Sequence, residues 1–75
     1  MNQNLMLKMV HVEGALIRVL GLAERRGFRP IRVNASPGEE GTLRVRLTVN
    51  SVRPLEQLIT QLEKLYDVTT VQRVC

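Results

Sequence analysis

The spacing of apolar residues switches repeatedly between two periods along this chain, and the order of the switches most constrains its fold. Residues 42–49, TLRVRLTV, alternate strictly, with Leu43, Val45, Leu47 and Val49 on one side. A period of two is typical of a strand that buries one face. Residues 3–12, QNLMLKMVHV, alternate in the same way. Since these are the most apolar alternating runs, we expect both to be central strands of a sheet.

After the first strand the period becomes that of a helix. From Ala15 onward the apolar residues follow the i, i+3, i+4, i+7 rule; they are Leu16, Val19, Leu20 and Ala23. Gly27 follows Arg25 and Arg26, whose charge suits the carbonyl end of a helix. A glycine at that point predicts a left-handed cap that ends the helix.

Pro30 opens a further alternating run in which Ile31, Val33 and Ala35 share one side. Because proline has no amide hydrogen, the start of this second strand is expected at a sheet edge. The turn cluster SPGEEG, residues 36–41, leads directly into the run at 42–49. The second and third strands are therefore predicted to form a hairpin.

The segment VRPLEQLITQLEKLY, residues 52–66, returns to the helical period. Ser51 is a candidate N-cap and Pro54 fits the first turn. The apolar stripe consists of Leu55, Leu58, Ile59, Leu62 and Leu65. The β-branched segment DVTTVQRV, residues 67–74, predicts a short fourth strand.

The resulting order is β-α-β-β-α-β, and both crossovers must be right-handed. We therefore predict an α+β fold of the ferredoxin-like sandwich class, a four-stranded antiparallel sheet of order 4-1-3-2 with two helices on one face. A chain of 75 residues is one domain, 1–75, near the size at which a core is hard to stabilise. Pairing with a second copy is a common remedy.

The sheet face away from the helices is predicted to be basic, in a chain of net charge +4. Its cations are Lys8, Arg32, Arg44 and Arg46. A solvated face that discourages sheet aggregation, a face for an acidic protein partner, and a phosphate-binding face all remain open. Nucleic acid is the least favoured, because Phe28 and Tyr66 are the only aromatic residues and both fall at helix ends, away from where bases would stack.

Catalytic, metal and membrane signals are weak. His11 is the sole histidine and Cys75 the sole cysteine, so no metal-ligand set and no nucleophile–base spacing is present. We therefore expect no metal, no cofactor and no enzymatic activity of this chain. A lone thiol fits the reducing cytoplasm. No secretory signal and no run of about 18 apolar residues occurs, so no membrane span is expected.

The loop between the first strand and the first helix is His11-Val12-Glu13-Gly14. Glycine at the first helical turn leaves backbone N–H groups uncovered, and helix N-termini attract carboxylates. Gly14 thus indicates either a tight turn or a point where a ligand or another chain approaches.

The run EGALIRVLGLAERRGFRPIRV resembles the ACT-domain signature, in which a glycine and small apolar residues open a helix ending in Arg-Gly-aromatic. The strand LRVRLTV and the run QLEKLYDV extend the resemblance over residues 5–74. Among ACT proteins the chain is most similar to the small regulatory subunits of acetolactate synthase (acetohydroxyacid synthase), of the short type with a single ACT domain.

This resemblance implies a non-catalytic, cytoplasmic regulatory subunit acting in the biosynthesis of valine, leucine and isoleucine. It implies a homodimer formed by edge-strand pairing, with amino acids bound at the interface. Its further partner would be a large catalytic subunit that carries thiamine diphosphate, FAD and magnesium. A free-standing ACT-type amino-acid sensor for another enzyme or regulator is the alternative.

The resemblance also assigns a candidate site for a ligand or for partner docking. Its residues are His11, Val12, Glu13, Gly14, Ala15, Leu16 and Arg29. Gly14 matches the glycine of the family's pocket, and Ala15 and Leu16 match the small and apolar residues after it. His11 and Arg29 stand where feedback-sensitive members have asparagine. These two departures favour activation that does not depend on an effector.

Overall fold

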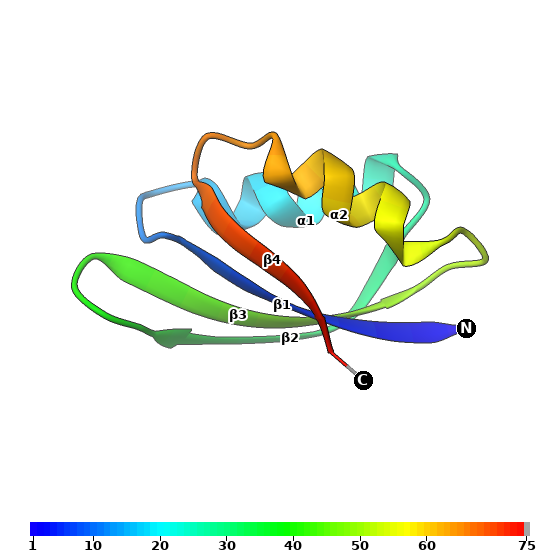
Figure 1. Ribbon diagram of the computed structural model, residues 1–75, viewed down its shortest axis with the longest axis horizontal. Coiled ribbons are helices and arrows are strands. Elements are labelled where there is room, and N and C mark those ends of the chain that lie inside the picture. The colour runs from blue at the N-terminus through cyan, green and yellow to red at the C-terminus, as the bar shows by residue number, and fades with distance from the viewer. Residues whose placement is uncertain (75) are drawn as a thin grey trace.

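The computed structural model describes residues 1–74, and Cys75 lies outside the described residues. The elements follow in the predicted order, and Figure 1 shows their arrangement. They are β1 (Asn2–Val10), α1 (Ala15–Arg25), β2 (Arg29–Pro37), β3 (Thr42–Asn50), α2 (Leu55–Glu63) and β4 (Val68–Val74).

The sheet confirms the predicted fold class. Its strand order is β2-β3-β1-β4, which is the expected order 4-1-3-2 taken from the other edge, and every pairing is antiparallel. Both helices lie on the same side of the sheet (Figure 1). The two central strands are β1 and β3, and the register sets Leu5 opposite Leu47 and Leu7 opposite Val45.

The core lies between the inner side of the sheet and the two helices. Alternate residues of β1 and β3 are buried there, as the period of two predicts. The fully buried large side chains include Leu55, Leu58 and Leu62 from the α2 stripe. Phe28, placed by sequence at a helix end, is completely buried and closes the core beyond α1. The chain's other aromatic residue, Tyr66, is almost fully exposed.

Gly27 ends α1 as predicted. Its φ of 88° is in the left-handed region, and the N–H of Phe28 donates to the carbonyl of Ala23 at 2.9 Å. This turn directs Phe28 inward while the chain leaves for β2. The guanidinium of Arg53 occupies the space that a Cβ at Gly27 would fill, at 2.8 Å from Nε. The positive φ favours glycine at this position, and any other residue would also make the exposed side chain of Arg53 shift.

Two local expectations were wrong. The N-cap of α2 is Pro54, not Ser51. The hydroxyl of Ser51 instead accepts a hydrogen bond from the N–H of Arg53 at 3.0 Å, within the turn before the helix. This is the competing local turn that serine side chains offer the backbone. The first strand ends at Val10 instead of residue 12, because the N–H of Val12 turns back to the carbonyl of Val10 at 3.1 Å instead of continuing the sheet ladder.

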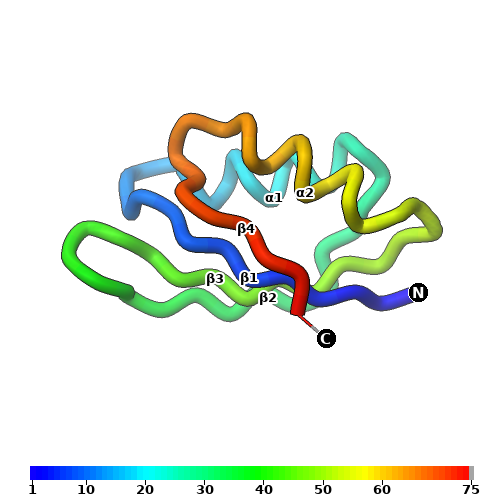
Figure 2. The backbone as a smooth tube through the Cα atoms, viewed as in Figure 1, coloured from blue at the N-terminus to red at the C-terminus, as the bar shows by residue number. Residues whose placement is uncertain are grey.

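Three connecting segments meet at one end of the molecule. The loop after β1, the turn between β2 and β3 and the turn between α2 and β4 all lie there, as the tube in Figure 2 shows. In the described part of the chain, no helix is long and apolar enough to cross a membrane.

Candidate functional site

The loop from His11 to Gly14 is fastened to both neighbouring turns by main-chain hydrogen bonds. The N–H of Val10 donates to the carbonyl of Asp67 at 2.8 Å, and the N–H of His11 donates to the carbonyl of Gly41 at 2.9 Å. The loop is therefore held from the β3 side and from the β4 side at once.

The N-terminus of α1 begins at Gly14 and has no side-chain cap. Gly14 is the N-cap with φ 81°, a backbone conformation that favours glycine, and the first turn contains no acidic residue. The first N–H groups of a helix have no acceptor within the helix, and the helix dipole adds partial positive charge there. The N–H of Ala15 already donates to the carbonyl of Val12 at 3.1 Å, so an anionic group or a carbonyl from outside the chain would be met by the N–H groups that follow it in the first turn.

A hollow of about 370 Å³ opens beside this helix end. We call it the loop hollow; it is lined by Val10, His11, Val12, Glu13, Gly14, Ala15, Leu16, Ile17 and Leu43. Its wall is mainly apolar, and Ile17 is 75% exposed. An apolar wall beside the N-terminus of a helix suits a small molecule with one apolar and one anionic end. It suits equally a partner chain that covers the exposed side chains.

An ion pair that the sequence analysis did not predict connects the first turns of α1 to the turn before β4. Arg18 donates from Nε to the carboxylate of Asp67 at 3.1 Å, and its Nη2 contacts the same oxygen. The side chain of Asp67 is 16% exposed. A Cβ built at Gly14 would stand 3.1 Å from Nη1 of Arg18. Glycine at this position therefore leaves room for the arginine that ties α1 to the turn before β4.

The sequence indicates where Arg18 lies on α1, but not which residue it pairs with. Arg18 lies one helical turn after Gly14, so the two must share a face of α1. Nothing in the local pattern around Asp67 indicated its partner, because 49 residues separate the two side chains.

Six of the seven predicted site residues lie together, and Arg29 lies elsewhere. His11, Val12, Glu13, Gly14, Ala15 and Leu16 all line the loop hollow. Arg29 begins β2 opposite Asn50, and Asn50 pairs with Asn2 at the start of β1, whereas the loop follows the end of β1. The two places are thus at opposite ends of the sheet. Arg29 lines a separate hollow with Glu24 and Gly27.

The four predicted cations of the open face are all on the side away from the helices. Lys8, Arg44 and Arg46 alternate with buried residues of β1 and β3, and Arg32 lies on β2 opposite Thr48. Lys8 is 3.7 Å from the carboxylate of Glu39. Within residues 1–74, no group of three or more His, Cys, Asp or Glu side chains is placed to hold a metal ion.

The fold defines a small α+β sandwich of the ferredoxin-like class, and comparison with known proteins gives its family. Residues 11–71 match the family model described as ACT domain. The matched range begins at the loop and includes both helices. The chain therefore belongs to the ACT domain family.

The curated relatives are small subunits of acetolactate synthase. The acetolactate synthase isozyme 3 small subunit of Escherichia coli (strain K12) is 39% identical over 64 residues, covering 81% of this chain and 39% of that protein. The acetolactate synthase small subunit of Buchnera aphidicola subsp. Schizaphis graminum is 36% identical over 64 residues, covering 81% and 40%. The chain thus spans about two fifths of the length of these relatives.

Solved structures agree on the fold. The crystal structure of the ACT domain from GTP pyrophosphokinase of Chlorobium tepidum superposes with a TM-score of 0.80, covering 97% of this chain and 96% of that one. The solution structure of the same domain gives a TM-score of 0.77. Both are 16% identical to this chain, so they support the architecture alone.

The Arg18–Asp67 pair is expected to stabilise the α1 end of the loop. Arg18→Gln and Asp67→Asn each remove the ion pair and leave the side chains close to their original size. In a double-mutant cycle followed by urea unfolding, the coupling free energy should be about 0.5–1 kcal/mol, because the pair is partly exposed. The coupling should fall in high salt. A coupling near zero at low salt would show that the pair does not hold the loop.

Proposed function

We propose that this chain is a non-catalytic regulatory small subunit of acetolactate synthase, and that it activates or stabilises a large catalytic subunit. The observation that carries the proposal is the similarity to small subunits of that enzyme over 81% of the chain. The reaction would belong to the biosynthesis of valine, leucine and isoleucine in the cytoplasm. Thiamine diphosphate, FAD and magnesium would be held by the large subunit.

The physical means of activation would be binding alone. A subunit without reacting groups changes a partner's rate only by binding its active conformation more tightly than its other conformations. The gain is a coupling free energy, typically about 1–3 kcal/mol. The loop hollow and the open sheet face are the two surfaces from which such coupling can arise.

A homodimer formed through β2 is part of the proposal. β2 is an edge strand that pairs only with β3. Its apolar residues Ile31 and Val33 are 50% and 39% exposed. An exposed apolar edge is a template for another strand, and a chain of this size gains stability from a second copy. Pairing two β2 strands would therefore bury surface that the monomer leaves in water.

Antiparallel pairing of two β2 strands would also complete the predicted site. Arg29 starts β2, and the loop hollow lies near the end of the sheet where β2 finishes at Pro37, opposite Leu43. In an antiparallel pair the start of one strand faces the end of the other. Arg29 of the second copy would then approach the N-terminus of α1 in the first.

A branched-chain amino acid is the ligand that we propose for this shared site. Its carboxylate would meet the N–H groups of the first turn of α1, and Arg29 of the second copy would add charge. Its aliphatic side chain would lie against Val12, Ile17 and Leu43. Because His11 and Arg29 replace the short amides of feedback-sensitive members, activation is expected without an effector.

The proposal is tested by assaying the large acetolactate synthase subunit of the same organism with and without this chain. We expect kcat to rise several-fold at saturating chain and to stay raised when valine, leucine or isoleucine is absent. Calorimetry with each amino acid measures effector binding separately. An unchanged rate, together with tight binding of an amino acid, would instead support the free-standing sensor.

Gly14→Asp is expected to abolish activation while the fold survives. Aspartate tolerates a positive φ better than most residues, so the backbone cost is small. The new carboxylate would stand beside Arg18 and would occupy the anion-attracting end of α1. Gly14→Asn, of equal size but neutral, is the matched control and should lose less activation. If Gly14→Asp activates and binds as well as the unchanged chain, the loop hollow is not the site.

Val33→Lys is expected to give a monomer. Val33 lies opposite the buried Leu47, on the helix side of β2, so the pairing of two β2 strands would bury the charge of a lysine at this position. Ser36→Lys places the same residue on the other side of β2 and should remain dimeric. Sedimentation velocity at several concentrations measures the outcome for both. Dimers of equal affinity for Val33→Lys and the unchanged chain would rule out pairing through this edge.

A further inference from the structure

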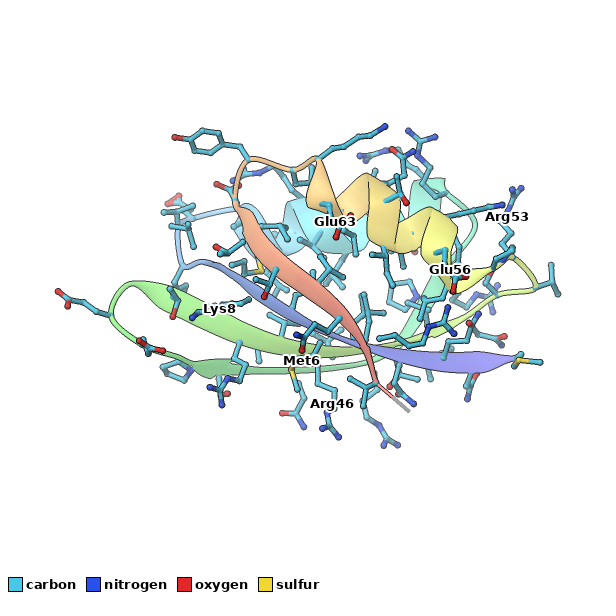
Figure 3. The ribbon with its side chains drawn as sticks, in the orientation of Figure 1. Met6, Lys8, Arg46, Arg53, Glu56 and Glu63 are labelled. Atoms are coloured by element: carbon cyan, nitrogen blue, oxygen red, sulfur yellow. The ribbon has the colours of Figure 1, made fainter. Side chains whose placement is uncertain are left out.

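The open side of the sheet concentrates positive charge without any carboxylate of its own strands. Alternation places Lys8 and Met6 of β1, Arg44 and Arg46 of β3 and Arg32 of β2 on this side. No residue at an outward position of the four strands within residues 1–74 is acidic. Figure 3 shows the side chains of Met6 and Arg46 on the side of the sheet away from the helices.

The cations are adjacent to one another in the sheet. The register sets Lys8 directly opposite Arg44, and Arg46 follows two residues later on the same side of β3. Like charges directly opposite on neighbouring strands are destabilising. The carboxylate of Glu39, 3.7 Å away in the β2–β3 turn, offsets the charge of Lys8 in part. The chain therefore retains a local electrostatic cost on this face.

Protection against aggregation does not explain this placement. Charged residues guard a sheet when they lie on its edge strands, where backbone groups are unpaired. Of the four cations, Arg32 alone is on an edge strand, β2. Lys8, Arg44 and Arg46 lie on β1 and β3, which are paired on both sides. The repulsion between these cations destabilises the middle of the sheet, and nothing within the described part of the chain compensates for it fully. Their placement therefore points to contact with another molecule.

A hollow of about 280 Å³ lies among these residues. We call it the arginine hollow; it is lined by Met6, Asn34, Ser36, Arg44 and Arg46. Asn34 lies opposite Arg46 and Ser36 opposite Arg44, so each guanidinium has a neutral hydrogen-bonding neighbour. On β1, the other neighbour of β3, Met6 lies opposite Arg46 on the same open side of the sheet and supplies an adaptable apolar contact. Two guanidinium groups, an amide and a hydroxyl around an apolar contact match an aspartate or glutamate side chain.

We infer that the open side of the sheet is the docking surface for an acidic patch on the large catalytic subunit, with one of its carboxylates seated between Arg44 and Arg46. This inference rests on the proposed function, which supplies the partner. A second copy of this chain does not fit, because two such faces would set like charges against each other. Nucleic acid fits less well, because no aromatic side chain lies on this face to stack a base.

The test compares two double charge reversals that change the net charge equally. Arg44→Glu/Arg46→Glu alters the arginine hollow. Arg25→Glu/Lys64→Glu alters exposed residues on the helix side and is the matched control. Binding of the large subunit is measured at two salt concentrations. We expect the first variant to bind at least tenfold more weakly and the second to bind within about twofold of the unchanged chain.

The weaker binding expected of Arg44→Glu/Arg46→Glu would not result from unfolding of the variant. A glutamate at position 44 faces Lys8 and exchanges a like-charge pair for an opposite-charge pair, so the first variant should be at least as stable as the unchanged chain. The chain's lysines, Lys8 and Lys64, provide an independent readout from opposite sides of the molecule. In the complex, acetylation should slow at Lys8 and continue at Lys64.

The outcomes separate this inference from the proposed function. If the unchanged chain neither binds nor activates the large subunit, the proposed function fails and the inference fails with it. If the unchanged chain binds but Arg44→Glu/Arg46→Glu binds equally well, only the docking surface is wrong. Equal weakening by both variants would show an effect of net charge alone and would also overturn it. Tighter binding of a single-stranded oligonucleotide than of the large subunit, lost in the first variant, would replace the acidic protein with nucleic acid.

Discussion

The antiparallel pairing of β1 with β3 is the interaction on which the rest of the structure depends. The register of this pairing determines which side chains of β1 and β3 face the helices, because side chains alternate along both strands. A slip of one residue would turn the Leu and Val side chains outward and the Lys and Arg side chains into the core. The dry core and the cationic open side are therefore consequences of one register.

The same pairing also positions the loop after β1. His11 continues from the end of β1 and bonds to Gly41, which precedes β3, while Val10 bonds across to Asp67 before β4. The N-terminus of α1 is thereby held at the edge of the core without being covered. In a chain this small, surface left open at a fastened loop and along an edge strand is available for association.

The two surfaces of the molecule differ in chemistry. The loop hollow joins an apolar wall to an uncapped helix end, whereas the arginine hollow is a cluster of donors on a flat sheet. The first suits a small amphipathic ligand or the edge of a second copy, and the second suits carboxylates of a larger partner.

The sequence by itself determined the element order, the two sides of each strand and the cap at Gly27, because these depend on periodicity and on the conformation of single residues. It also located the loop, since a glycine at the change of period marks it. Only the tertiary structure decided that Arg18 reaches Asp67, that Ser51 closes a turn instead of capping α2, and that Arg29 lies at the far end of the sheet from Gly14. These outcomes depend on register and on which loops meet at one end, and local patterns carry no information about contacts between segments far apart in the chain.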